Sequence, residues 1–166
     1  MANVNRLDLQ VSLANALTKA APLSGGPGQA LKLFHAFTQG LNPGQVRQVY
    51  FGLLSLLASG TADLDLSGTT LKEEDGTNLA LVKLRVLGIY NEGPGALSIF
   101  RPAAATGVPL FLAISDGLVL PAGGLFLWSC GATDTGVTVT AATGDLISVL
   151  ETAALPVTYL VMIAGI

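Results

Sequence analysis

Short runs in which apolar and polar residues alternate recur along this chain. In "RLDLQVSL" (6–13), leucine and valine alternate with Asp8, Gln10 and Ser12, and "ALKLFHAFTQG" (30–40) alternates in a similar way. A period of two residues is that of a strand with one buried face, because successive side chains of a strand point to opposite sides. The pattern therefore predicts a strand in each run.

The stretch from Val49 to Gly60, "VYFGLLSLLASG", is ambiguous because its residue types also suit a helix. We favour a strand, then a turn at "ASGT", then a returning strand "ADLDL" (62–66) in which Leu64 and Leu66 alternate with acids. The three pieces together predict a strand, a turn and a second strand in place of one helix.

The charged segment "KEEDGTN" (72–78) contains an Asp-Gly pair, which is typical of a tight turn. The segment "LALVKLRVLGIYN" (79–91) follows it and predicts another strand. In that strand we expect Leu84 on one face with its apolar neighbours, and Lys83 and Arg85 on the other.

The remainder of the chain continues as short strands separated by Gly and Pro, in "ALSIFRP", "VPLFLAIS", "DGLVLPAGG", "LFLWSCG", "GVTVTAATG", "DLISVLE" and "PVTYLVMIAG". Strands that recur every about 8–12 residues with turns between them are typical of an all-β sandwich or barrel. No segment predicts a crossover helix, and no repeat of fixed period indicates a propeller or a solenoid. We therefore expect an all-β, antiparallel fold.

The chain length of 166 residues suffices for one domain with its own core. The segment "LSGGPGQ" (23–29) is rich in Gly and Pro and breaks regular structure. We expect residues 1–28 to form an extended N-terminal arm or a first strand that ends in this joint. Residues 29–166 are then expected to form a single β-sandwich domain.

The last residues, "LPVTYLVMIAGI" (155–166), are apolar nearly throughout. They could form a membrane anchor, a buried strand, or a surface held for another chain. The stretch is shorter than the about 20 residues that a membrane-spanning helix needs. Its valines, isoleucine, threonine and tyrosine favour a strand. We therefore reject the anchor and expect a strand buried in or against a sheet.

Charged residues make up only 11% of the chain, the net charge is −3, and no Lys or Arg follows Arg101. A protein that tracks phosphates carries a basic surplus, so we expect no nucleic-acid partner. Small soluble domains keep a charged surface, and the mean hydropathy here is high, which predicts that other subunits cover part of the surface. The alternative is a monomer whose surface is built from Gly, Ala and Thr.

The candidate reactive residues are few. His35 is the sole histidine and Cys130 the sole cysteine. Each lies within an apolar strand pattern, so we expect both to be structural, with no disulfide framework and a reducing site of synthesis. The N-terminal residues lack a basic region followed by an apolar one, so we expect no secretion signal. No P-loop, nucleophile elbow or zinc motif is present, and we expect no cofactor and no metal.

Asp63 and Asp65 share one face of an expected strand, with their Cα atoms about 6–7 Å apart. A glycosidase pair or a calcium site would need such closeness. The alternating leucines explain the same acids as the solvated face of the strand, which is the interpretation we favour. The threonines at alternate positions in "TGVTVTAATGD" (135–145) suit either an exposed strand or pairing between subunits.

Residues 46–166 resemble a type of protein encoded among the virion genes of tailed bacteriophages. The features that carry the resemblance are a "DLSG" strand end, the acidic "DG" loop, the strand "VKLRVLGIYN", the "PAGG" turn, the hairpin "GVTVTAATGDLISV" and the final strand "VTYLVMIAG". These motifs are made of turns and strands and contain no catalytic set. The first 45 residues carry no resemblance.

The resemblance implies a jelly-roll-like β-sandwich that decorates or cements a phage head. Proteins of this type sit at junctions between major capsid subunits, usually as homotrimers or dimers. It thus implies a structural protein and not an enzyme, on the capsid surface of a virion after synthesis in the host cytoplasm. Its partners would be the major capsid protein and itself, with no membrane.

The alternation before the Gly/Pro joint also suggests that the N-terminal arm contacts the capsid by strand addition. The residues of this expected capsid-contact arm are Asn5, Arg6, Leu7, Leu9, Val11 and Leu13.

Two other functions remain open. One is a tail, baseplate or receptor-binding module of the virion, for which Tyr90 beside the turn "NEGPG" is the aromatic residue of interest. The other is a small glycan hydrolase that uses Asp63, Asp65 or Glu92.

Overall fold

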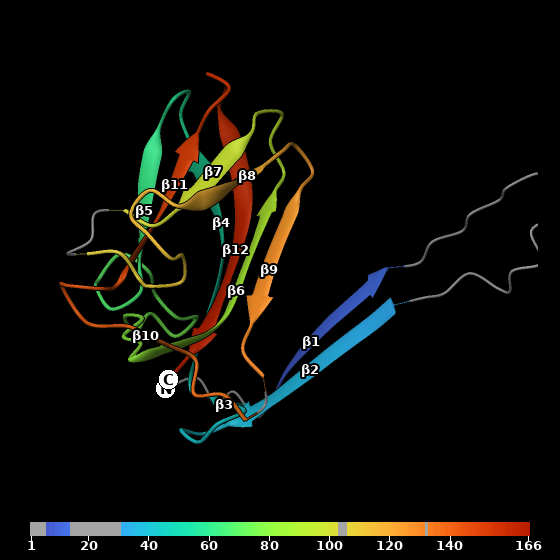
Figure 1. Ribbon diagram of the computed structural model, residues 1–166, viewed down its shortest axis with the longest axis vertical. Helices are drawn as coiled ribbons and strands as arrows, with labels where there is room; N and C mark the ends of the chain where they lie inside the picture. The colour runs from blue at the N-terminus through green and yellow to red at the C-terminus, as the bar shows by residue number, and fades with distance from the viewer. Residues whose placement is uncertain (1–5, 14–30, 103–105, 132) are drawn as a thin grey trace, which may run out of the picture.

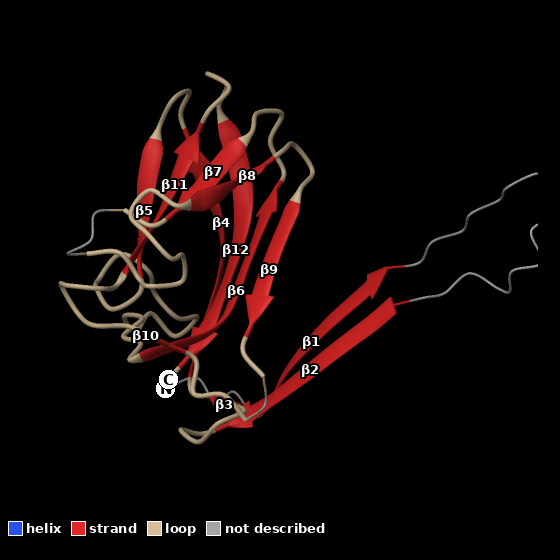
Figure 2. Ribbon diagram, in the orientation of Figure 1, coloured by secondary structure: helices blue, strands red, loops and turns tan. Residues whose placement is uncertain are grey.

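A computed structural model describes residues 6–13, 31–102, 106–131 and 133–166 of the chain, with side chains from residue 36 onward. Every regular element in these ranges is a β-strand (Figure 2). The expected all-β class is confirmed.

The larger of two sheets, here called the broad sheet, contains four main strands. They run in the order β9 (Leu125–Ser129), β6 (Lys83–Asn91), β12 (Val157–Gly165) and β4 (Gln48–Leu56), each antiparallel to its neighbour. The short strand β10 (Val137–Thr138) pairs with the beginning of β6. Strands distant in sequence therefore lie side by side, as in a sandwich.

The second sheet, here called the narrow sheet, has the order β5 (Thr61–Asp65), β11 (Leu146–Glu151), β7 (Leu97–Phe100) and β8 (Gly117–Leu120), again antiparallel. Figure 1 shows the two sheets face to face, with β5, β11, β7 and β8 in front of the broad sheet. The fold is an antiparallel, jelly-roll-like β-sandwich, as the sequence predicted.

One hydrophobic core fills the space between the sheets. Both sheets supply it from alternate positions, and the connecting segment 66–82 closes it at one side. Its fully buried members include Leu64, Leu66, Leu79, Leu84, Leu87, Ile89, Leu97, Ile99, Val149, Tyr159, Val161 and Ile163. Burial of this many large apolar side chains supplies most of the favourable free energy of folding.

The final apolar stretch forms β12, which pairs along its whole length with β4 and from Tyr159 to Gly165 with β6. Val157, Tyr159, Val161 and Ile163 face the core and are buried. The prediction of a buried strand is confirmed. The length of the run thus reflects a central strand that is apolar on both faces.

The ambiguous stretch before residue 60 is the strand β4, followed by a turn in which the N–H of Gly60 donates to the carbonyl of Leu57. The preference for a strand over a helix is confirmed. The returning strand β5 joins the narrow sheet, so this turn carries the chain from one sheet to the other.

A two-stranded ribbon leaves the sandwich at one end. β1 (Arg6–Leu13) pairs antiparallel with β2 (Leu31–Gln39), and the end of β2 pairs with the short strand β3 (Gln45–Val46). Figure 1 shows β1 and β2 projecting away from the two sheets. The arm therefore includes β2 as well as β1, and the boundary expected at residue 28 falls outside the described residues.

Candidate interaction surface

The outer face of the broad sheet is apolar across all four main strands. The register aligns Phe51 of β4 with Met162 of β12, then with Gly88 of β6 and Leu127 of β9. Phe51 is 68% exposed although it lies in the middle of a strand. A large aromatic side chain left in solvent in the middle of a strand is costly unless something covers it.

A second row lies beside the first. Leu53 of β4 aligns with Leu160, Tyr90 and Leu125 of the neighbouring strands. Leu53 and Leu125 are each more than half exposed, and Leu57, just past the end of β4, is 79% exposed. Neither row contains a charged side chain. We call the outward residues of these two rows, together with Leu57, the apolar face.

The exposed part of the apolar face amounts to an area on the order of 500 Å², judged from the size of these side chains. Single exposed apolar residues are common on soluble proteins, whereas a contiguous patch of this size is often functional. Among the described strands, β4 also pairs on one side only, which leaves its other edge open beside Phe51 and Leu53.

One end of the same outer face is already covered from within the chain. Phe37, near the end of β2, is 1% exposed and packs with Val46, Val86, Cys130 and Ala164. The pairing of Val86 with Ala164 places them in the row next to Phe51 and Met162. The base of the ribbon therefore packs on the outer side of the broad sheet, next to the apolar face.

Arg85 fixes the segment that connects the ribbon to the sandwich. Its guanidinium donates to the carbonyl oxygens of Leu41 (3.3 Å), Asn42 (2.5 Å), Gln45 and Thr135 (3.4 Å). Arg85 is fully buried, and burial lowers the pKa of its guanidinium. A planar fork of five donors suits such a set of carbonyls, which a lysine could not satisfy together.

The prediction that Leu84 shares a face with its apolar neighbours is wrong at Val86, because Leu84 packs in the core between the sheets whereas Val86 packs with Phe37 on the outer side. Between Ala164 and Gly165 the register shifts by one residue, so that Ala164 pairs with Val86 and Gly165 with Leu84. Arg85 is the extra residue of this bulge, and bulges redirect side chains. Strict alternation along the sequence could not reveal the shift.

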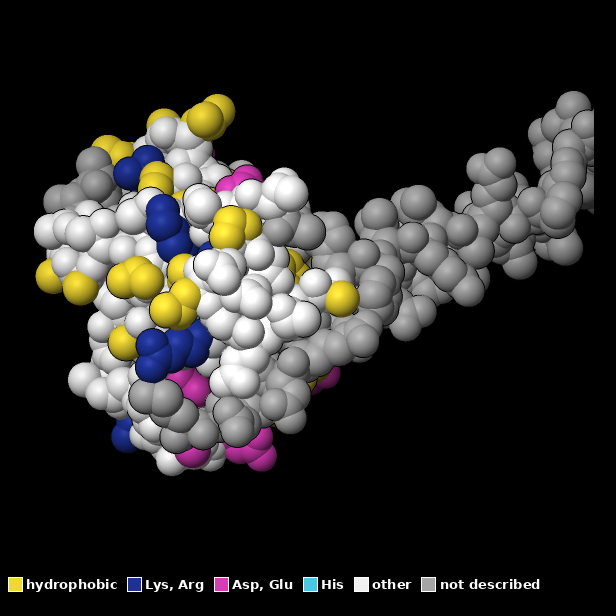
Figure 3. Space-filling view, turned by 90° about the horizontal axis from the view of Figure 1, so that it is seen from below, with side chains coloured by type: hydrophobic (Ala, Val, Ile, Leu, Met, Phe, Trp, Pro, Cys, Tyr) yellow, Lys and Arg dark blue, Asp and Glu magenta, His cyan; other side chains and the backbone are white. Residues whose placement is uncertain are grey.

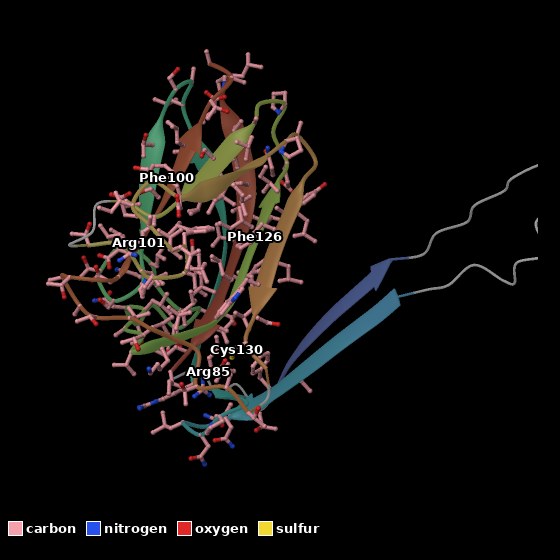
Figure 4. All side chains as sticks on the ribbon, viewed as in Figure 1. Arg85, Phe100, Arg101, Phe126 and Cys130 are labelled. Atoms are coloured by element: carbon pink, nitrogen blue, oxygen red, sulfur yellow. The ribbon has the colours of Figure 1, made fainter. Side chains whose placement is uncertain are left out.

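Cys130 lies beside Arg85 at the same end of the broad sheet (Figure 4). Burial raises the pKa of its thiol, which keeps it protonated and unreactive. The thiol belongs to the cluster under Phe37, in agreement with a structural role. His35 lies on β2, among the residues whose side chains are not described. In the same view Phe126 lies between the sheets, and Phe100 and Arg101 lie on the narrow-sheet side.

The acids proposed for a hydrolase do not form a common site. Asp63 and Asp65 lie on β5 of the narrow sheet, whereas Glu92 follows β6 of the broad sheet and is exposed. Asp63 accepts a hydrogen bond from Ser148 at 2.5 Å, and Asp65 accepts one from the N–H of Ser67. Within the described ranges no three His, Cys, Asp or Glu residues come together as metal ligands would.

A hollow of about 460 Å³ lies between the acidic loop, the beginning of β4 and Ile166. Glu73 and Gln48 line it and bind each other, because the Gln48 amide donates to the Glu73 carboxylate at 2.6 Å. Figure 3 looks at the molecule from below and shows acidic, basic and hydrophobic side chains mixed on this end. The hollow thus offers no dominant chemistry for a ligand.

The expected turn at the "DG" pair is confirmed. Gly76 has a φ of +82°, and Gly76 N–H donates to the carbonyl of Glu73. The backbone N–H of Thr77 donates to Asp75, and this hydrogen bond holds the pKa of the Asp75 carboxyl well below its usual range.

Asn91 ties the two sheets together at the end remote from the ribbon. Its buried amide donates to the carbonyl oxygens of Gly95 (2.8 Å), Leu120 (3.1 Å) and Pro121 (3.0 Å), and its oxygen accepts from the N–H of Gly93. One side chain of β6 therefore holds two loops and the end of β8 in the opposite sheet.

Glu151 makes a matching connection from the narrow sheet. Its carboxylate accepts from the N–H groups of Ser59 (2.7 Å) and Ala153 (2.5 Å), which lie in two different turns. Burial by itself raises the pKa of Glu151, but hydrogen bonds from four backbone N–H groups outweigh it, so the pKa lies below its ordinary value. The charged form of this side chain is therefore part of the fold.

No pattern in the sequence predicted a role for the apolar face, Asn91, Arg85 or Glu151. Tyr90, for which the sequence did suggest a role, lies in the second row of the apolar face and not in a cluster of aromatic loop residues. Residues 6–13 of the expected capsid-contact arm form β1, and Asn5 lies outside the described residues. A signal for the face existed in β4, where both alternating sets of positions are apolar.

No helix in the described part of the chain is long and apolar enough to cross a membrane. No protein-family model and no curated protein matches the sequence. The solved structure of the Schizosaccharomyces pombe Cnp3 cupin domain is similar with a TM-score of 0.36 and 9% identity, over 98% of this chain and 85% of that chain. A similarity at this level supports no inference about function.

Proposed function

We propose that this chain is a structural protein of a tailed-phage virion that binds the outside of the capsid and stabilises it by bridging major capsid subunits. It acts as a homo-oligomer, a trimer or a dimer, and has no enzymatic activity. The observation that carries the proposal is the apolar face, whose two rows extend across four strands without a charged side chain.

Three further features support the proposal. The jelly-roll-like sandwich is the fold that the resemblance to phage decoration proteins implies. The ribbon of β1 and β2 projects beyond the sandwich, as an element that reaches another subunit must. The acids considered for glycan hydrolysis lie on different sheets or are bound by neighbouring side chains and backbone, which removes the support for a catalytic pair.

A decoration protein stabilises a shell by binding its mature form and not its immature form. The binding free energy then adds to the stability of the mature shell by mass action. The test incubates the purified chain with mature and immature shells of the same phage and sediments the particles. Binding to mature shells alone, with a higher temperature of shell disruption, is the expected result. No co-sedimentation with mature shells would overturn the proposal.

Removal of residues 1–22 tests the role of the arm in shell binding. β1 pairs with β2 and with neither sheet of the sandwich, so the truncated chain is expected to fold with an unchanged core. Shell binding is expected to be lost. Full binding by this truncated chain would show that residues 5–13 do not contact the capsid.

A further inference from the structure

The ribbon has two chemically different faces. The register of β1 with β2 pairs Leu9 with His35, Val11 with Leu33 and Leu13 with Leu31, and it pairs Leu7 with Phe37. Residues at paired positions share a face of the ribbon, and this face is apolar apart from His35. We call these eight residues the ribbon stripe.

The opposite face of the ribbon is polar for most of its length. It contains Arg6, Asp8, Gln10 and Ser12 of β1, with Lys32 among their partners on β2. A ribbon with one apolar and one polar face is built to lie on an apolar surface. In this structure the ribbon projects away from its own sandwich (Figure 1).

The seating of Phe37 shows what surface the stripe fits. Phe37 belongs to the ribbon stripe, and its side chain is buried against Val86 and Ala164 on the outer side of the broad sheet. The next rows of that side form the apolar face, which its own ribbon leaves uncovered. One residue of the stripe thus already packs on this side of the broad sheet.

The two surfaces also agree in size. From Leu7 to Leu13 the stripe extends about 20 Å, and from Phe51 to Leu57 the apolar face also extends about 20 Å along β4 and its end. The apolar face carries no charge in its two rows, so nothing on it opposes an apolar ribbon. Its exposed area, on the order of 500 Å², is more than half of the about 800 Å² that each partner of a stable complex buries.

We propose that the apolar face is the seat for the β1–β2 ribbon of a second copy of this chain. The ribbon stripe of one copy packs on Phe51, Leu53, Tyr90, Leu125, Leu160 and Met162 of the next. The polar face of the ribbon then points outward and is free for a shell. This inference deepens the self-association in the proposed function, and it is tested without any shell, so its failure and a failure of shell binding are separable.

The first measurement is the solution mass of the full chain by light scattering at micromolar concentration. The expected result is a stable oligomer for the native chain and a monomer for Leu53→Glu. The matched control is Val119→Glu, because Val119 is exposed to a similar degree (64%, against 58% for Leu53) but lies on the narrow sheet. The control is expected to keep the oligomer. Far-UV circular dichroism spectra that are the same for the three proteins show that the loss of the oligomer does not arise from unfolding, a control that association does not affect as it affects an unfolding midpoint.

The second measurement identifies the occupant by cross-linking. A tagged chain carrying Leu53→Cys is mixed with an untagged chain carrying Leu9→Cys and oxidised, while the buried native Cys130 stays unreactive. A disulfide between the two chains is expected. A mixture of Thr61→Cys and Leu9→Cys chains is the control, because Thr61 lies on the narrow sheet, and it should not cross-link.

Four results would overturn the inference. In the mass measurement, they are a monomeric native chain and an oligomer that survives Leu53→Glu. In the cross-linking measurement, the third is a cross-link of Leu53→Cys chains to one another in the absence of Leu9→Cys. The fourth is a cross-link formed only within a chain that carries both substitutions. The third would indicate face-to-face packing of two apolar faces. The fourth would indicate that the ribbon folds back on its own sandwich.

Discussion

The two sheets share one core on their inner sides but differ on their outer sides. On the outer side of the narrow sheet, polar and apolar residues are mixed, since Asp63 accepts a hydrogen bond from Ser148 opposite it and Leu150 lies between Thr61 and Ser98. On the broad sheet, Phe51 lies opposite Met162, and Leu53 opposite Leu160, with no charged residue among them. The outer side of one sheet is thus mixed in polarity, whereas two rows on the outer side of the other are apolar.

This difference locates the excess of apolar residues in the chain. Core packing requires one apolar face per sheet, and the outer side of the narrow sheet adds only scattered apolar residues such as Phe100 and Leu150. The broad sheet has a second apolar face, which raises the apolar content of the chain. Under the proposed function, this second face and not the core accounts for the unusual composition.

The largest expected loss of stability comes from a substitution of Asn91, whose hydrogen bonds connect the two sheets. In Asn91→Asp the carboxylate replaces an amide that donates to three carbonyl oxygens. A buried carboxylate that faces three carbonyl acceptors and keeps only the Gly93 N–H as a donor costs about 3–5 kcal/mol of the free energy of unfolding. Urea unfolding followed by tryptophan fluorescence measures it.

The control for this substitution is Asn78→Asp, because Asn78 is exposed. We expect a change within about 0.5 kcal/mol there. Equal losses in the two variants would show that Asn91 does not hold the sheets together.

A smaller loss of stability, which depends on pH, is expected when Glu151 of the narrow sheet is substituted. The pKa of Glu151 is lower in the folded chain than its ordinary value, so its contribution to stability is present above the unfolded pKa and is lost as pH falls through the folded pKa. Glu151→Gln should lower the urea midpoint at neutral pH and flatten its decline in acid.

The matched control is Glu74→Gln, which removes a charge of the same sign from an exposed position in the acidic loop. It should leave the midpoint at neutral pH unchanged. An acid profile that is identical for Glu151→Gln and the native chain would contradict the role assigned to the carboxylate.

The smallest effect, with the opposite sign, is expected in the shared core. The hydroxyl of Tyr159 is buried and has no hydrogen-bond partner among the described residues. Burial, with a smaller contribution from Tyr50, raises its pKa to about 12. Tyr159→Phe removes a buried hydroxyl that makes no hydrogen bond there. The substitution should therefore stabilise the chain by about 1 kcal/mol. A destabilisation of similar size in thermal unfolding would reveal a partner for the hydroxyl.

Much of the fold was predictable from local patterns. Alternation identified the strands around residues 6–13, 31–39 and 62–65, and the residue types of the final stretch identified a buried strand. Both depend on neighbours in sequence, because the pleat of a strand imposes a period of two on any half-buried segment. The "DG" turn was predictable for the same reason, since a positive φ at Gly76 is a local requirement.

The sequence by itself therefore determined that this chain forms an antiparallel sandwich with few charges and more apolar residues than one core needs. Only the tertiary structure decided where the excess lies. Register between distant strands aligns Phe51 with Met162, a bulge at Arg85 places Val86 on the outer side of the broad sheet, and the loops that meet at Asn91 and Glu151 come from both sheets. These features depend on contacts between residues far apart in sequence, and a local pattern contains no information about which distant strand becomes the neighbour.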